Sequence, residues 1–199
     1  MQEGLLEEQN CKLNYTFIFW FSYFKENKQK QINDYEENLR KIGSFNTAEE
    51  FWGYYQHIRR PDSLPKGCEF LLFKEGIKPL WEDTANLGGG RFVLHIKKIF
   101  SNKTWEDILL AFIITDENFD KINGVVINVR GWEVLLSVWT KELSTEDELE
   151  KYKKWLRVSL GMTENIKIDY KQFPNPEELI KRAAEEKCEA KAPTPEPKE

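Results

Sequence analysis

The sequence predicts an α+β fold, in which helices pack on one face of an antiparallel sheet. Several short segments alternate apolar and polar residues with a period of two, which is typical of strands. Between them lie stretches with helical spacing that begin at recognisable capping residues. Strands and helices follow one another in no strict alternation, and this order indicates an antiparallel sheet with helices on one face. The other face of such a sheet is left free to bind something.

Six segments are predicted to be strands. The longest, Leu13–Phe24, is dense in aromatic and β-branched residues and has no helix cap. The other five are Glu69–Phe73, Arg91–Lys97, Gly124–Arg130, Val134–Trp139 and Ile166–Tyr170. The polar run 25–34 is predicted to be a loop.

Three main helices are predicted, each from a threonine followed three residues later by an acidic residue. This spacing is a capping signature, because the hydroxyl accepts a backbone N–H of the first turn. The three pairs are Thr47 with Glu50, Thr104 with Asp107, and Thr145 with Glu148. A short fourth helix is predicted at Asn175, which precedes a proline.

The length of 199 residues suits one domain with tails. We expect a flexible segment over 1–10, a globular domain over 11–182, and a disordered, charged, proline-containing tail over 183–199. No apolar run is long enough to span a membrane and the first residues lack a signal-peptide profile, so a cytoplasmic location is expected, with the nucleus as an alternative. The three cysteines lie far apart and have no metal-ligand spacing, so the sequence predicts neither a disulfide framework nor a metal or other cofactor.

Charge and composition narrow the function. The net charge of −5 argues against a protein that holds long nucleic acids by their phosphates. Only two histidines are present, neither lies in a catalytic pattern, and no phosphate-binding glycine loop precedes a helix, so an enzyme is not expected. Aromatic residues make up 14% of the chain, which fits either an aromatic core or platforms for stacking a ligand.

One short segment suggests a specific ligand. Trp81 lies in a loop-like stretch directly before Glu82 and Asp83. An indole beside a carboxylate suits a flat, cationic ring with paired N–H donors, as in methylated guanine. The alternative is a tryptophan that anchors a loop beside two solvated acids, and the tripeptide alone favours this alternative.

Three longer runs carry a family resemblance. They are YEENLRKIGSFNTAEEFWGYYQHI from Tyr35, LFKEGIKPLWEDTANLGGGRF from Leu72, and GVVINVRGWEVLLSVWT from Gly124. In this order and spacing the chain resembles the eukaryotic initiation factor 4E family of cap-binding proteins, from about Leu13 to Tyr170. The resemblance implies a curved antiparallel sheet with three main helices on its convex face. It also implies a pocket for the 7-methylguanosine cap of mRNA on the concave side.

The resemblance assigns roles at the base of the cap. Trp81 would be one stacking wall, Glu82 would accept the guanine hydrogens, and Trp139 would lie near the methyl group. Tyr35 corresponds to the opposing wall, where the best-known members have tryptophan. Tyrosine there resembles the 4E homologous proteins, a subclass that includes translational repressors.

The resemblance also assigns the phosphate end of the cap. Arg130, after Asn128, matches the arginine that meets the cap phosphates, and Arg91 matches a second basic position. Trp132 and Leu135 stand where the best-studied members have lysines. This difference implies weaker contacts to the phosphates.

A second surface is implied on the helical side. Trp52 corresponds to a tryptophan that receives a partner helix carrying a tyrosine, four residues, a leucine and an apolar residue. Ala48 lies four residues earlier on the same helix face, and Leu109 is a candidate from the second helix. The alternative is that Trp52 is a core residue.

The chain is expected to be a monomer, and two hypotheses follow for its function. The first is a binder of capped mRNA that recruits or excludes an initiation scaffold or repressor. The second is an adaptor with a weakened cap pocket that acts through Trp52.

Overall fold

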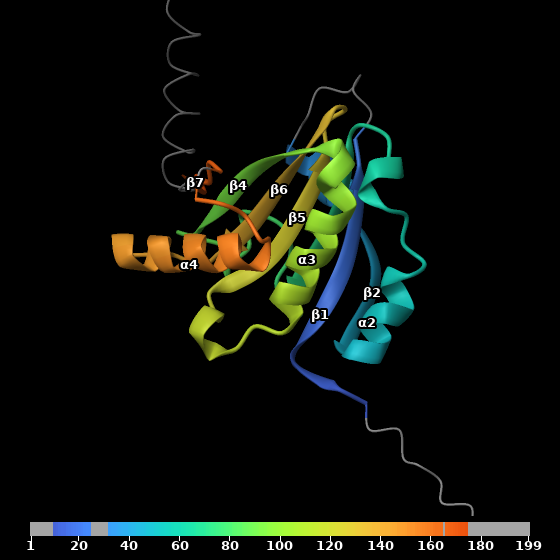
Figure 1. Cartoon of the computed structure of the whole chain (residues 1–199). Coiled ribbons are helices and arrows are strands. Elements are labelled where there is room, and N and C mark those ends of the chain that lie inside the picture. The colour runs from blue at the N-terminus through green and yellow to red at the C-terminus, as the bar shows by residue number, and fades with distance from the viewer. Residues whose placement is uncertain (1–9, 25–31, 165, 175–199) are drawn as a thin grey trace, which may run out of the picture.

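The computed structural model of the chain describes residues 10–24, 32–164 and 166–174 (Figure 1). Seven strands form one antiparallel sheet in the order β2-β1-β3-β5-β6-β4-β7. The strands are β1 (Lys12–Tyr23), β2 (Arg40–Thr47), β3 (Cys68–Lys74), β4 (Gly90–Lys97), β5 (Ile122–Val129), β6 (Glu133–Thr140) and β7 (Asp169–Gln172). The α+β prediction is confirmed.

Three helices lie on the same face of this sheet (Figure 1). They are α2 (Ala48–Tyr55), α3 (Ser101–Ile113) and α4 (Glu146–Ser159), and a fourth helix, α1 (Ile32–Asn38), lies between β1 and β2 in the chain. Three short 3-10 turns complete the described elements, at Pro61–Ser63, Lys98–Phe100 and Glu117–Phe119. No helix in the described part of the chain is both long and apolar enough to cross a membrane.

The alternation of side chains along the strands divides the apolar residues between two faces. On β3, Phe70 and Leu72 belong to the main core beneath the helices, whereas Leu71 and Phe73 belong to a second cluster on the opposite face. Successive residues of a strand point to opposite sides, so β1, β3, β5 and β6 each contribute to both clusters. Both faces of the middle of the sheet are therefore buried, which explains the nearly continuous apolar run of this strand.

Two of the three predicted helix starts are confirmed. Thr47 and Thr145 each accept the backbone N–H of the acidic residue three positions later, at 3.2 Å in both cases. The prediction at Thr104 is wrong, because α3 already begins at Ser101 and the Thr104 hydroxyl donates to the carbonyl of Phe100 at 2.9 Å. A threonine inside a helix often donates to the carbonyl four residues earlier. Its spacing to a later acidic residue can then match the capping signature by chance.

Two elements of the structure were not predicted, and a third begins later in the chain than predicted. Helix α1 was not predicted and begins at Ile32, so the loop predicted over 25–34 is wrong at its last residues; strand β2 was not predicted either, and β7 begins at Asp169 instead of Ile166. Strand β2 lies at the sheet edge and contains Gly43, where an added Cβ would lie 2.4 Å from the ring of Tyr54. Close approach of that ring therefore requires the glycine, which weakens the strand signal. The helix predicted at Asn175 and the tail predicted for 183–199 lie outside the described residues, as does most of the segment 1–10.

Candidate functional site

The sheet face opposite α2, α3 and α4 has an apolar floor at its centre. Four buried residues form it: Leu71, Phe73, Val126 and Trp139. Five partly buried residues pack around them: Trp20, Leu39, Ile77, Trp81 and Phe173. Four of these five lie outside the strands of the sheet: Leu39 follows α1, Ile77 and Trp81 lie in the segment after β3, and Phe173 follows β7. Chain segments from different parts of the sequence thus gather on one face.

The loop that carries Trp81 is built around two polar side chains. The carboxylate of Asp83 accepts the backbone N–H of Lys78 at 3.0 Å and that of Ala85 at 2.9 Å. The amide of Asn86, which is completely buried, donates to the carbonyl of Leu80 at 2.7 Å. Asp83 therefore acts inside the loop, which explains why only one of the two acids after Trp81 faces solvent.

A second buried asparagine fastens this loop to the sheet. Asn123 of β5 donates to the carbonyl of Ala85 at 2.7 Å and to the side-chain oxygen of Asn86 at 2.9 Å. Because buried polar groups are costly unless they are paired, this arrangement fixes the loop against β5. Trp81 is held half-buried beside the apolar floor, and the following Glu82 is exposed.

A chain of polar contacts runs along one side of the site. The Tyr35 hydroxyl donates to Glu69 at 3.1 Å, and the amide of Asn128 donates to the other oxygen of the same carboxylate. The Nε of Arg130 donates in turn to the Asn128 oxygen at 3.2 Å. Burial of the phenol, and then the negative charge of Glu69, raise the pKa of Tyr35 well above its ordinary value. Burial, and then repulsion by Arg130, lower the pKa of Arg91.

These contacts bring together the predicted residues of the phosphate end. Arg91, Asn128 and Arg130 lie close enough for their charges and hydrogen bonds to affect one another. Arg130 is exposed and Arg91 is half-buried. The family resemblance pointed to both arginines, whereas Glu69, which accepts from Asn128 and Tyr35, was missed. Its position at the start of a predicted strand, in register with Leu71 and Phe73, was the signal that could have found it.

Tyr35 and Trp139 differ from the simplest expectation. Tyr35 was predicted to be a stacking wall, and its ring already stacks on Phe24, with centroids 5.3 Å apart and planes 9° apart. Trp139 was predicted to lie near the ligand, but it is only 6% exposed, because Phe73 and Phe173 cover it at 5.4 and 4.5 Å. Trp139 is thus part of the floor of the site.

An ion pair joins the two sides of the site. Lys78, in the Trp81 loop, donates to Glu36 of α1 at 2.8 Å. Glu36 follows Tyr35 directly, so this contact connects the Tyr35 helix to the loop of Trp81. Both side chains are exposed, and the pair therefore adds little stability.

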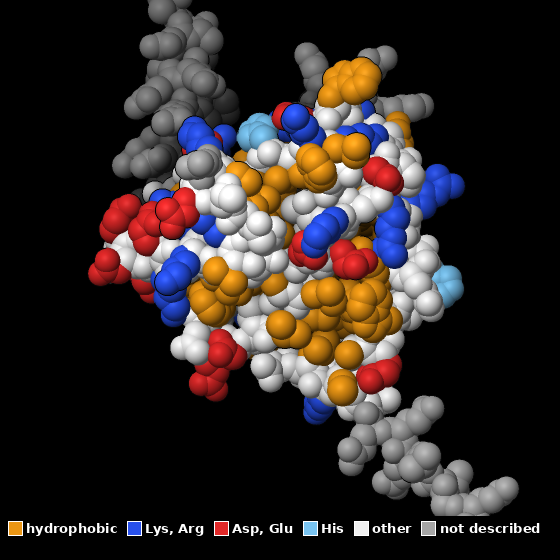
Figure 2. All heavy atoms as spheres, in the orientation of Figure 1, with side chains coloured by type: hydrophobic (Ala, Val, Ile, Leu, Met, Phe, Trp, Pro, Cys, Tyr) orange, Lys and Arg blue, Asp and Glu red, His pale blue; other side chains and the backbone are white. Residues whose placement is uncertain are grey.

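The helical side carries the second predicted surface. Trp52 on α2 is 44% exposed and makes edge contacts with Phe51 and Tyr55. Ala48 is half-buried one turn earlier. Leu109 was predicted to join them, but it is fully buried in the core and cannot reach a partner in this structure, because α3 turns it toward the sheet. Figure 2 shows apolar side chains gathered on this side, over the region between α2 and α3.

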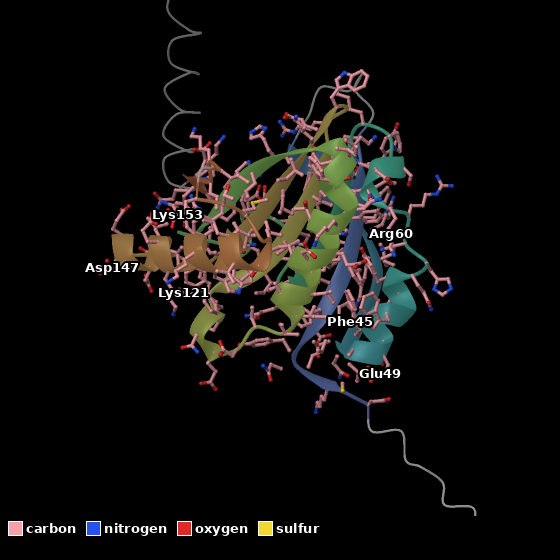
Figure 3. All side chains as sticks on the ribbon, in the orientation of Figure 1. Phe45, Glu49, Arg60, Lys121, Asp147 and Lys153 are labelled. Carbon is pink, nitrogen blue, oxygen red and sulfur yellow. The ribbon has the colours of Figure 1, made fainter. Side chains whose placement is uncertain are left out.

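Contacts at the start of β1 fix the N-terminal end of α2. The carboxylate of Glu49, labelled in Figure 3, accepts the backbone N–H of Cys11 at 3.1 Å. The backbone N–H of Ala48 donates to the carbonyl of Cys11 at 2.9 Å. The helix that carries Trp52 is therefore held at both its cap and its first turn.

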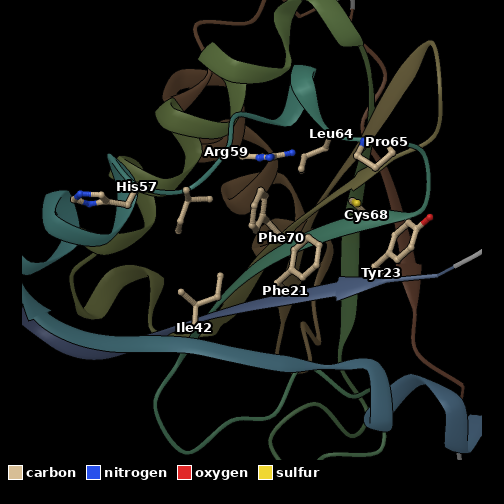
Figure 4. Close-up of a pocket in the computed structure, with 10 residues that line it drawn as sticks. Phe21, Tyr23, Ile42, His57, Arg59, Leu64, Pro65, Cys68 and Phe70 are labelled. Carbon is tan, nitrogen blue, oxygen red and sulfur yellow. The ribbon is translucent and has the colours of Figure 1, made fainter.

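A pocket of about 500 Å³ opens where the chain leaves α2 (Figure 4). Its lining is mostly apolar and comes from β1, β2, β3 and the segment after α2: Phe21, Tyr23, Ile42, His57, Ile58, Arg59, Leu64, Pro65, Cys68 and Phe70. The apolar surface on this side of the sheet edge thus extends beyond the helix itself.

Comparison with known proteins agrees with this geometry. The family model described as eukaryotic initiation factor 4E matches residues 12–187. This chain belongs to the eukaryotic initiation factor 4E family. Among the family's proteins, "Eukaryotic translation initiation factor NCBP" of Oryza sativa subsp. japonica is 36% identical over 160 residues, which cover 80% of this chain and 70% of the relative. "Eukaryotic translation initiation factor 4E" of Xenopus laevis is 33% identical over 177 residues, covering 85% of this chain and 81% of the relative.

Solved structures of the 4E family share the fold. Ascaris suum eIF4E-3 in complex with the m7G cap has a TM-score of 0.75 and 29% identity, covering 83% of this chain and 92% of that one. Caenorhabditis elegans eIF4E-3, in complex with the 4E-binding protein Mextli and a cap analog, has a TM-score of 0.74 and 29% identity, covering 88% of this chain and 96% of that one.

Proposed function

We propose that this chain binds the 7-methylguanosine cap of mRNA on the sheet face opposite α2, α3 and α4 and acts in translation initiation or its repression. Membership of the 4E family supports this proposal, as do the cap complexes of the Ascaris suum relative. We further propose a cytoplasmic monomer that binds without catalysis and needs no cofactor. The mRNA cap and a scaffold or repressor protein would be its two ligands.

The observation that carries the proposal is the fixed loop with Trp81 and Glu82 beside an apolar floor. A methylated guanine is flat and positively charged, so it would stack on the indole and gain a cation–π attraction. The exposed carboxylate of Glu82 would accept the paired N–H donors of the base. The face of Tyr35 that Phe24 does not cover would supply the second wall.

The phosphates would meet Arg130 and Arg91 at the other end of the site. Trp132 and Leu135 supply no charge there. Contacts to the phosphates position a nucleotide, whereas contacts to the base specify it. We therefore propose that the methylated base determines specificity and that two cations attract the phosphates.

Titration of the intrinsic fluorescence with 7-methylguanosine triphosphate and with unmethylated guanosine triphosphate tests the proposal. Saturable quenching by the methylated nucleotide, and much weaker quenching by the other, is expected because only the methylated base is cationic. Equal quenching by both, or none by either, would contradict cap recognition.

A second candidate is an adaptor that acts chiefly through the surface of Ala48 and Trp52. The partial exposure of Trp52 favours it, as does the complex of the Caenorhabditis elegans relative with the 4E-binding protein Mextli. The occupied Tyr35 hydroxyl is consistent with a weakened cap pocket. Capture of the protein on cap resin, with elution by the methylated nucleotide, separates the candidates, since an adaptor without cap affinity would not be retained.

A further inference from the structure

An indole projects from the turn between β5 and β6. Trp132 is 96% exposed, more than any other large apolar side chain among the described residues. Its backbone is nevertheless fixed, because its carbonyl accepts the N–H of Lys98 at 3.1 Å and the turn is closed by the bond from Arg130 N–H to Glu133 carbonyl at 2.9 Å. Gly131 takes the left-handed conformation that this tight turn requires, with φ of 93°.

Fold stability does not account for the indole. A side chain this exposed removes almost no apolar area from water, so it contributes little to stability. Single exposed apolar residues are common on protein surfaces, and exposure alone would imply no function. The residues around Trp132 are what indicate a function for its indole.

The turn continues directly from the proposed cap site. Arg130 stands two residues before Trp132, and its side chain ends the polar chain that leads through Asn128 to Glu69 and Tyr35. A nucleotide whose phosphates meet Arg130 would extend its next residue toward this end of the sheet. In that arrangement the indole of Trp132 would lie on the side of the site where the RNA chain leaves.

The charges at this end suit a polyanion. Arg130 and Lys97 are exposed, and Lys97 stands opposite Glu133 in the β4–β6 pairing. The carboxylate of Glu133 is matched by His95, whose Nδ1 lies 3.2 Å away. This end of the sheet therefore has two exposed cations, Arg130 and Lys97, beside Glu133, which already has His95 as a partner. The whole chain, in contrast, has a net charge of −5. A flat aromatic ring flanked by cations is the usual platform for single-stranded nucleic acid.

We propose that Trp132 stacks the base of the first transcribed nucleotide, immediately after the cap. This inference rests on the proposed cap-binding function and adds a second base platform to the same site. Stacking on an aromatic face tolerates any base, so the subsite would favour capped RNA over the free cap without reading its sequence.

A protein partner would use the position differently. Ile99 and Phe100 follow Lys98 and are 81% and 59% exposed, so an apolar partner seated on this end would engage them with Trp132. A stacked base needs only the indole and the cations. Ile99→Ala is therefore a matched control, because it removes an exposed apolar side chain from the same end of the sheet but leaves the ring in place.

The test is calorimetric titration of the full chain, its Trp132→Ala and Trp132→Tyr variants, and the Ile99→Ala control. The ligands are 7-methylguanosine triphosphate and a capped RNA of four adenosines. Trp132→Ala should weaken binding of capped RNA by about fivefold or more, the low end for loss of one stacked base. Affinity for 7-methylguanosine triphosphate should stay within about twofold for every variant, and Trp132→Tyr should recover part of the loss.

The outcomes separate the inference from the function on which it rests. If the full chain does not bind 7-methylguanosine triphosphate, the cap function fails and the inference fails with it. If the chain binds that nucleotide but Trp132→Ala leaves capped RNA unaffected, or weakens both ligands equally, the inference alone is overturned. An equal loss for Ile99→Ala also overturns it and points to a protein-binding patch.

Discussion

The indole of Trp81 is half-buried, whereas the amides that hold its loop, Asn86 and Asn123, are fully buried. The side chains that hold the loop in place thus differ from the indole that is proposed to contact the cap. The tripeptide of Trp81, Glu82 and Asp83 could not reveal this division, because the partners of the loop lie on another strand. The structure leaves Glu82 exposed and gives Asp83 a role within the loop.

Trp81→Ala should weaken binding of 7-methylguanosine triphosphate by about tenfold or more, because one stacking platform is lost. The loop should persist, since its asparagine contacts do not involve the ring. Urea unfolding beside nucleotide titration checks both parts of the prediction. Normal affinity, or a large loss of stability, would mean that Trp81 mainly anchors the loop.

Tyr35→Phe should lower the free energy of unfolding by about 1 to 2 kcal/mol. The variant keeps the stack on Phe24 but removes the donor to Glu69, and a partly buried acceptor that loses its partner is costly. Chemical denaturation of both proteins at neutral pH measures the difference. An unchanged midpoint would indicate that solvent already satisfies the carboxylate.

For single residues, sequence patterns predicted which residues matter better than they predicted the contacts that those residues make. Trp81 packs beside the apolar floor, Glu82 and Arg130 are exposed, and the roles of all three in cap binding stay predictions. The bond from Tyr35 to Glu69 joins residues 34 positions apart on different elements, so no local pattern could announce it. Leu109 was misassigned because helical spacing does not say which flank of an amphipathic helix meets the sheet.

Elements with a strong local signal were predicted well, and those defined by their surroundings were not. The helices after Thr47 and Thr145 have capping residues that work in isolation. Strand β2 depends on the close packing of Tyr54 over Gly43 and has exposed polar positions along the sheet edge. Such a strand forms because β1 offers it a partner, and its sequence alone indicates little.

Helix α2 should support partner binding independently of the sheet face. Trp52→Ala is expected to weaken binding of a helical peptide with the tyrosine and leucine pattern by at least about 2 kcal/mol, as for other aromatic anchors. Retention on cap resin should not change, because the two surfaces share no contacts. Calorimetry with the peptide and resin retention on one preparation give both results. A sharp drop in melting temperature would instead assign Trp52 to the core.

For the molecule as a whole, one buried cation makes stability depend on pH. Lys74, at the end of β3, is 7% exposed, donates to the carbonyl of Asp120 at 2.9 Å, and lies 3.8 Å from the centre of the Tyr15 ring. Burial, and then repulsion by Lys141, lower its pKa from 10.5 to about 8. The folded protein therefore releases this proton more readily than the unfolded chain does.

Between pH 8 and 10.5 the unfolded chain holds a proton on Lys74 that the folded protein has lost, so unfolding takes up a proton. The contribution of Lys74 to the free energy of unfolding should therefore rise steadily as pH increases from 8 to 10.5. We expect the free energy of unfolding to increase by about 2 kcal/mol relative to that of Lys74→Met between pH 8 and pH 10. Urea titrations of both proteins across this range cancel the tyrosine contributions that they share. Parallel pH profiles would contradict the lowered pKa.

The pinning of the Trp81 loop by Asn86 and Asn123 also has a consequence for kinetics. A site that is already formed needs no rearrangement before the ligand arrives, so its association is limited by encounter. In stopped-flow mixing with 7-methylguanosine triphosphate, the observed rate constant should rise linearly with nucleotide concentration. Asn123→Ala frees the loop from β5. For this variant we expect the rate constant to level off at high nucleotide concentration, because closure of the loop then becomes rate-limiting. A plateau already present in the unaltered protein would show that the loop moves despite its two asparagines.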